Sequence, residues 1–242
     1  MRARAGGARS LRVRAAAVVC AVAAAVPAVA GCGAEKGGSV VSAADAGREA
    51  GARAVSATPS AGASLSRERA RREALVRSAE VGWEKAAGTA TGEVAGSELV
   101  ELDLGRADRD TGPSPSPSPT PGAPLWTATV ALKDGTAHLV TIDAVTGKVL
   151  ASRPEPDQDT GDRRELAGLL DRAARTPRQA ADAATEKFPG TVTGLQLDEN
   201  DAGNTSTVVW ETEVADTGDW TEADITVDAV SGKVLRERVD RG

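Results

Sequence analysis

Apolar residues between positions 75 and 90 recur at helical spacing. The intervals are four, four, three and four residues, and charged or small polar residues fill most of the positions between them. Such a stripe predicts one amphipathic helix. Ser66 is placed to cap its start, and Gly88 and Gly92 indicate its end. The residues of the stripe are Leu75, Ala79, Trp83, Ala86 and Ala90.

Strict alternation of apolar and acidic residues follows this helix. Val100, Leu102 and Leu104 alternate with Glu101 and Asp103, which predicts a strand with one buried and one wet face. Residues 111–124 then read TGPSPSPSPTPGAP. Proline lacks an N–H donor and fixes φ, so this tract can join neither a sheet nor a helix.

The later part of the chain contains an internal repeat. Residues 126–130 (WTATV) match 210–214 (WETEV), and residues 138–150 match 223–235. The interval from the tryptophan to the aspartate of the matching segment is 17 residues in the first copy and 18 in the second. Agreement in both content and spacing predicts two copies of one structural unit.

The second copy has its own helix and first strand. Residues 176–179 (TPRQ) read as a capping box with proline at the first helical position, and Pro189-Gly190 ends the helix. Leu195 and Leu197 then alternate with polar residues, as a strand requires. An amphipathic run at 166–173 precedes the cap and corresponds to the run around Leu75 and Val76 in the first copy.

The repeat changes the interpretation of the proline tract. Leu197 precedes Trp210 by 13 residues, whereas Leu104 precedes Trp126 by 22. The tract at 111–124 is therefore predicted to be an insertion in a hairpin loop of the first copy. The boundary between the copies falls near residues 153–161, which gives repeat 1 at 65–153 and repeat 2 at 162–242.

Both copies close on the same turn. Asp143 and Asp228 follow a strand and can accept backbone N–H bonds across the turn. Gly147 and Gly232 supply the positive φ that a short hairpin loop needs. The two aspartates could instead be catalytic carboxylates, but their identical turn contexts favour a structural role.

The N-terminus reads as an export signal. Five arginines and no acid in the first fourteen residues precede an apolar stretch at 15–30, which is too short for a comfortable membrane span. Residues 29–32 (VAGC) resemble the lipobox of bacterial lipoproteins, so Cys32 is predicted to be lipidated after removal of residues 1–31. The alternative is an ordinary signal peptide with an incidental cysteine. Residues 32–64 are rich in Gly, Ala and Ser and predict a flexible tether.

Composition narrows the possible functions. Removal of residues 1–31, with five Arg and no acid, leaves a net formal charge of −11, which argues against nucleic-acid binding and against a polybasic membrane patch. Lipidation of Cys32 would leave no thiol for a disulfide, a nucleophile or a metal site. With five aromatic residues in the whole chain, the cores must consist mainly of aliphatic residues and alanine. Two units of this size should pack against each other.

Few residues suggest chemistry. His138, the only histidine, lies in a predicted strand with no partner indicated by spacing. The acidic stretch 198–201 (DEND) could hold calcium but lacks the spacing of an EF-hand loop, so a solvated loop is the expectation. Trp220 lies in a polar loop of the second copy and is the best candidate for an exposed partner contact.

These motifs together resemble the PepSY family. The shared pattern is a helix with a Pro-Gly end, a strand, a strand opening with Trp, then a strand closing on Asp-Ala-x-x-Gly-Lys-Val. Residues 176–235 match almost throughout, and residues 126–150 match well. The resemblance implies a non-catalytic module found in metallopeptidase propeptides and bacterial envelope proteins, often proposed to restrain peptidases.

The expected protein is α+β, with two tandem PepSY-like units, each a helix packed on a small antiparallel β-meander. The expected function is that of an extracytoplasmic, lipid-anchored module that binds a protein, possible targets being a secreted peptidase or another envelope protein. The alternative is a small-ligand or ion sensor that uses a cleft between the repeats. No cofactor, metal or catalytic residue is expected, because the sequence lacks a Ser-His-Asp set, a ligand cluster and a phosphate loop.

Overall fold

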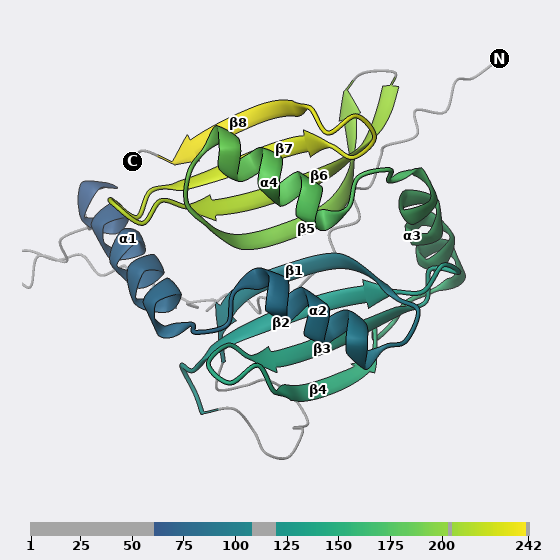
Figure 1. The fold of residues 1–242 in the computed structure, drawn as a ribbon, viewed down its shortest axis with the longest axis horizontal. Coiled ribbons are helices and arrows are strands. Elements are labelled where there is room, and N and C mark those ends of the chain that lie inside the picture. The colour runs from purple at the N-terminus through teal and green to yellow at the C-terminus, as the bar shows by residue number, and fades with distance from the viewer. Residues whose placement is uncertain (1–60, 108–119, 203–204, 241–242) are drawn as a thin grey trace, which may run out of the picture. The chain divides into compact units, whose positions relative to one another are not determined.

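The computed structural model describes residues 61–107, 120–202 and 205–240 (Figure 1). The export signal at 1–31, Cys32, most of the tether and residues 108–119 of the proline tract lie outside the described residues. The helices are α1 (Ala61–Ser78), α2 (Trp83–Glu93), α3 (Thr160–Arg172) and α4 (Pro177–Lys187). The strands are β1 (Glu98–Arg106), β2 (Pro124–Ala131), β3 (Ala137–Asp143), β4 (Val149–Pro154), β5 (Thr191–Ala202), β6 (Thr205–Ala215), β7 (Glu222–Asp228) and β8 (Val234–Asp240).

All eight strands form one antiparallel sheet with the order β4-β3-β2-β1-β5-β6-β7-β8. Each half of the sheet is a meander, and the two meanders meet where β1 pairs with β5. That central ladder joins Glu101 to Gln196, Leu102 to Leu195 and Asp103 to Gly194. The sequence predicted two units that pack against each other; the structure has one continuous sheet, whose two halves meet by edge-to-edge strand pairing.

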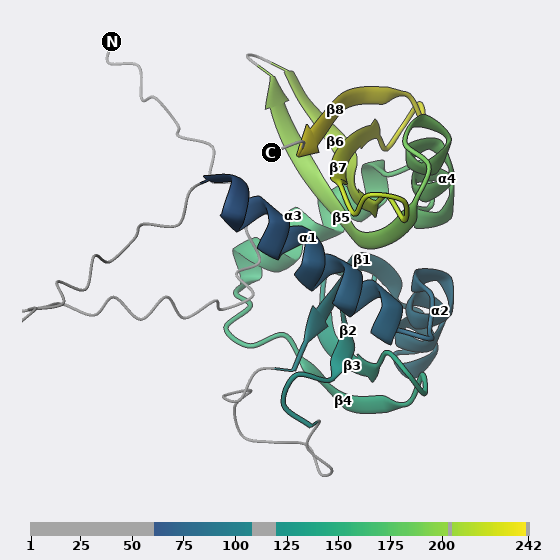
Figure 2. The same ribbon diagram turned by 90° about the vertical axis from the view of Figure 1, so that its left-hand side faces the viewer.

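Helices cover both faces of the sheet. Figure 2 shows α2 and α4 side by side on one face, while α1 and α3 lie on the other side, near opposite ends of the central strands in Figure 1. α2 packs on β1, β2 and β3, and α4 packs on β5, β6 and β7. The core between these layers is aliphatic and contains two tryptophans. Its largest fully buried side chains include Trp126, Trp210, Leu102, Ile142, Leu195 and Ile225.

The single helix expected around residues 75–90 is wrong. The chain forms α1 and α2 with a break at 79–82, so the spacing of four from Ala79 to Trp83 runs through a corner. The N–H groups of Glu80 and Val81 both donate to the Ala144 carbonyl, at 2.9 and 2.8 Å, and these bonds replace a continuous helical ladder. Ser66 is not a cap either, because α1 already begins at Ala61.

The second half follows its local signals more closely. Thr176 accepts from the Gln179 N–H, and the Gln179 side chain returns a bond to the Thr176 N–H, so the predicted capping box is confirmed. α4 ends at Lys187, just before Pro189, as expected. α3 has a capping box of its own at Asp159 and Asp162.

The acidic stretch 198–201 is not a loop. It continues β5, which extends to Ala202 and pairs with β6 along its length. Asp198 pairs with Val209 in this ladder, and Glu199 forms an ion pair with Arg172 of α3 at 2.7 Å. Strand pairing holds the backbone extended, so this stretch does not wrap around a cation.

The proline tract connects two neighbouring strands. β1 pairs with β2 directly, and the Ala107 N–H donates to the Ala123 carbonyl at 2.9 Å at the base of the connection. Pro124 belongs to β2, opposite Arg106, so the inserted segment ends earlier than the predicted 124. No helix in the described residues is both long and apolar enough to cross a membrane.

Candidate functional site

The two Asp-Gly turns have nearly identical geometry. Asp143 Oδ1 accepts from the N–H groups of Val145 and Thr146 at 2.9 and 2.7 Å, and Gly147 has a φ of +75°. In the second turn, Asp228 Oδ1 accepts from Val230 and Ser231 at 3.0 and 2.6 Å, and Gly232 has a φ of +78°. These backbone hydrogen bonds lower the pKa of both carboxyl groups. The charge of each aspartate therefore stabilises its own turn, by accepting backbone N–H groups there. The turn glycines have a positive φ, which would strain a residue with a side chain.

The two core tryptophans bind the segment that precedes each helix. Trp126 Nε1 donates to the Val81 carbonyl at 2.7 Å, and Trp210 Nε1 donates to the Arg175 carbonyl at 2.9 Å. Val81 and Arg175 each lie two residues before the first residue of α2 or α4. The indoles are buried, so each N–H needs such a partner, and each bond fixes the start of a helix over the sheet.

A groove lies on the helical face where the two halves of the sheet meet. Its volume is about 470 Å³. One wall is the side of α2, the other is the corner between α3 and α4, and the floor includes Leu99 of β1 and Leu197 of β5. The walls also carry the ion pair of Glu84 with Arg178, at 3.1 Å. The other apolar side chains of the lining include Trp83, Ala87, Leu170, Ala173, Pro177 and Trp210.

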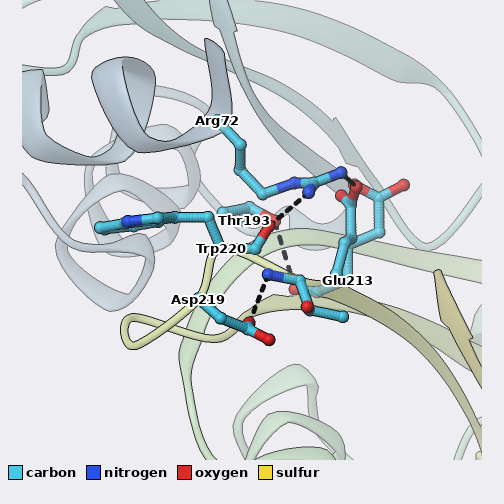
Figure 3. Close-up of polar contacts among 7 residues, drawn as sticks. Arg72, Thr193, Glu213, Asp219 and Trp220 are labelled. Atoms are coloured by element: carbon cyan, nitrogen blue, oxygen red, sulfur yellow. Dashed lines mark hydrogen bonds and ion pairs between the residues drawn. The ribbon is translucent and has the colours of Figure 1, made fainter. Parts of the chain in front are cut away.

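The loop between β6 and β7 is docked on α1 (Figure 3). Arg72 donates to the Trp220 carbonyl at 2.6 Å and forms an ion pair with Glu222, and the Arg77 guanidinium lies 5.4 Å from the centre of the Trp220 ring. Trp220 is half-buried and has a φ of +62°, which is unusual for a bulky residue. The indole predicted to be an exposed partner contact therefore holds α1 to the second half of the sheet.

The loop between β2 and β3 contacts the start of α3, as the loop between β6 and β7 contacts α1. Gln158, in the segment leading to α3, donates to the Gly135 carbonyl at 2.8 Å and accepts from the Ala137 N–H at 3.1 Å. Gly135 has a φ of +81°, and a Cβ there would lie 1.8 Å from the Arg163 carbonyl oxygen. Gly135 has the same place in its loop as Trp220 has in the loop between β6 and β7. Each precedes a threonine, Thr136 or Thr221, whose carbonyl accepts the backbone hydrogen bond that closes the loop. Each half of the sheet is thus bound by the helical segment that leads into the other half.

Carboxyl groups gather on the sheet face opposite α2 and α4. Glu101 and Asp103 of β1 and Glu211 and Glu213 of β6 lie in two adjacent rows across the sheet. Burial by surrounding protein raises the pKa of all four, even though Asp103 and Glu213 keep an exposed outer surface. The shift is largest at Glu213, where burial and the charges of Asp103, Glu222 and Asp224 raise the pKa to about 7.

Other candidate residues do not converge on a site. His138 is half-buried in β3 between Val130 and Pro154, apart from both Asp-Gly turns in the sheet register. Within residues 61–107, 120–202 and 205–240, no three His, Cys, Asp or Glu side chains are arranged to hold a metal ion. The sequence suggested a cleft between the repeats but did not identify the residues that line the groove or form the carboxyl rows, because they come from elements far apart in the chain.

Residues 176–238 match the PepSY family model, "Peptidase propeptide and YPEB domain". No curated protein matches the chain. A crystal structure of a "putative lipoprotein" from Clostridium difficile 630 is 22% identical, covers 67% of this chain and 95% of its own, and has a TM-score of 0.38. The YpmB protein from Bacillus subtilis is 14% identical, with 64% and 95% covered and a TM-score of 0.23.

The matched segment begins at Thr176, the cap of α4, and ends within β8. It contains the helix, the strand opening with Trp210 and the Asp228 turn on which the sequence resemblance was based. The predicted resemblance is confirmed for residues 176–238, which match the PepSY family model.

Proposed function

We propose that this chain is a lipid-anchored binding module of the bacterial cell envelope, built from two PepSY-like units. Residues 65–153 and 162–242 are the units, Cys32 carries the lipid, and the groove at their junction receives side chains from an exported protein. The PepSY resemblance makes a secreted peptidase the first class of partner to test. No catalytic role is assigned to any residue.

Equivalent contacts support the two-unit organisation. The N–H groups of Ala174 and Arg175 donate to the Ala229 carbonyl, at 2.9 and 2.7 Å, as those of Glu80 and Val81 do to Ala144. The tryptophan-to-carbonyl bonds correspond in the same way. In the central ladder Leu102 pairs with Leu195. These two leucines occupy equivalent positions in the two halves, because each lies two residues before a leucine that pairs with a core tryptophan. This correspondence supports an approximate two-fold relation between the halves, with the axis through this pair.

The groove is the observation that carries the binding proposal. Its lining comes from both units, so its shape depends on the assembled sheet and not on one helix alone. Its aliphatic and indole surface offers burial to an apolar side chain, and Arg178 and Glu84 at the wall offer charge to a polypeptide backbone or side chain. Trp220 can add only the outer surface of its ring to such a contact, because Arg77 stacks on it.

Two glycines of α2 allow a matched test. Gly88 lines the groove and Gly92 lies one helical turn further on outside it, and a Cβ at either position meets nothing within 4 Å. Gly88→Trp should fill the groove, whereas Gly92→Trp makes the same substitution outside the groove lining and should leave it open. We expect a defined exported protein to be retained by wild type and by Gly92→Trp and lost with Gly88→Trp. Equal retention by both variants would place the partner elsewhere.

A small-ligand sensor is the second candidate. The groove volume lies within the range of about 300–1,000 Å³ typical of ligand pockets. Under this alternative a small molecule would raise the melting temperature of wild type and of Gly92→Trp but not of Gly88→Trp, and no exported protein would be retained.

A further inference from the structure

The junction between the two halves of the sheet is its shortest ladder. We call the β1–β5 ladder the seam. It contains three residue pairs, centred on Leu102 and Leu195, whereas the ladders inside each half extend along most of their strands. Beside the seam, three contacts hold the two halves together: that of α1 with the Trp220 loop, that of Gln158 with the Gly135 loop, and the ion pair of Glu84 with Arg178. A change in the seam can therefore alter the relation between the halves while each half stays folded.

A row of charged residues crosses the seam on the face opposite α2 and α4. Asp103, Gly194, Glu213, Asp224 and Arg238 lie directly opposite one another on successive strands, so their side chains share this face. Gly194 has no side chain, and the position of a Cβ there is 2.8 Å from Glu213 Oε2. The Glu213 carboxyl group thus lies over the seam strand β5, on the side of Asp103.

The charges around Glu213 do not neutralise it. Arg72 from α1 acts to lower the pKa of Glu213, but its guanidinium is held by Glu222 and by the Trp220 carbonyl (Figure 3). β5 contributes Gly194 and Gln196, which carry no charge. Other charged groups on this face are Asp103 and Glu101 from β1, Glu211 from β6, Glu222 and Asp224 from β7, and Arg236, Arg238 and Asp240 from β8. Arg236 forms an ion pair with Glu211 at 3.8 Å.

We propose that Asp103 and Glu213 form a carboxyl pair across the seam that couples the joint between the two halves to pH. When the pair holds a proton, it carries one negative charge and the ladder is closed. When both groups are ionised, their repulsion loosens the ladder. The floor of the groove uses β1 and β5 as well, through Leu99 and Leu197, but the coupling does not depend on what the groove binds.

The ionisation properties of the two groups agree with this geometry. Burial raises the pKa of both, and Asp103 adds to the rise at Glu213, whose pKa is about 7. An unfolded chain releases the Glu213 proton near its ordinary pKa of 4.5. The proton on Glu213 therefore stabilises the folded chain fully below about pH 4.5, and this stabilisation is lost as the pH rises through about 7.

Amide hydrogen exchange on the full mature chain tests the coupling. Protection factors would be measured between about pH 5.5 and 8.5 for wild type, Glu213→Gln and Glu186→Gln, which removes the same charge from an exposed site on α4. In wild type and Glu186→Gln, protection factors at the seam should fall by about threefold to tenfold as the pH rises through 7. The tenfold limit corresponds to a difference of one pKa unit between the closed and the open seam. In Glu213→Gln the seam should stay protected throughout.

The ladders within each half provide the internal comparison. Amides of β2–β3 and β6–β7 should change much less than those of the seam, and an equal loss in all ladders would overturn the proposal. So would a pH-dependent fall that persists in Glu213→Gln. Asp103→Asn removes the same pair from the other strand and should behave alike. If neither variant folds, the wild-type titration decides, since a seam equally protected across the range contradicts the coupling.

Discussion

Replacing Gly135 by alanine should undo the contact between α3 and the β2–β3 loop. The new Cβ would lie 1.8 Å from the Arg163 carbonyl oxygen and 2.6 Å from its carbon, both of which are backbone atoms of α3. A flexible side chain could move away, but here the helix itself or the loop must shift. The glycine also has a φ of +81°, so the substitution carries a conformational cost in addition to the clash.

Gly96 separates these two costs. It has the same φ of +81°, but a Cβ there meets nothing within 4 Å. Gly96→Ala should therefore lose only the left-handed backbone preference, about 1–2 kcal/mol. Gly135→Ala should lose this amount plus about 1–3 kcal/mol for overpacking against α3. The difference between the two free energies of unfolding isolates the contact of α3 with the first half of the sheet.

Urea denaturation of wild type and both variants, followed by tryptophan fluorescence, gives the three free energies of unfolding. If the two alanine variants differ by less than about 0.5 kcal/mol, which is the ordinary spread of surface substitutions, the contact of α3 with Gly135 carries no stability and the reciprocal docking of the helices is wrong. A change in the slope with urea would instead indicate that the two halves unfold separately.

Three further predictions concern other parts of the chain. Cys32→Ala should remove the protein from the membrane fraction, and a wild-type protein that is exported in soluble form without lipid mass would contradict the anchor. Asp228→Ala and Asp143→Ala should each lower the free energy of unfolding by about 0.5–1.5 kcal/mol in chemical denaturation, because the turn hydrogen bonds are lost. Since the pKa of both carboxyl groups is lowered, this stabilisation is present above about pH 4 and is lost as the pH falls. A cost that is unchanged well below pH 4 would refute the role of the charge. Replacing residues 108–119 by a short turn should leave the melting temperature within a few degrees, since loop length has little weight, and a large loss would show that the segment contributes to the fold.

Features set by neighbouring residues could be predicted from the sequence. The Thr176 capping box and the positive φ of Gly147 and Gly232 depend on a few residues and the backbone between them. The alternation at Leu102 and Leu104 placed those side chains in the core for the same reason, since a strand alternates its faces. The match of residues 176–238 to the PepSY model relies on this local pattern.

Features set by distant residues could not be predicted. The break before Trp83 depends on bonds to the Ala144 carbonyl, about 60 residues away in sequence. The stacking of Trp220 beneath Arg77 and the position of Glu213 over Gly194 depend on how the halves pair. One signal was available in the sequence: with one inserted residue, Trp220 aligns with Gly135, so an indole stands where the first half of the sheet has a glycine in a left-handed conformation.

Site-specific photo-crosslinking tests whether the groove between the two halves binds an exported protein. A photoreactive residue at position 88, in the groove, should capture one defined protein in the intact cell envelope. The same photoreactive residue at position 92, one turn along α2, should capture that protein much less. Leu197→Trp, which places an indole in the floor of the groove, should abolish capture from position 88. Equal capture from both positions, or none from position 88 while the chain still retains its partner, would contradict the account.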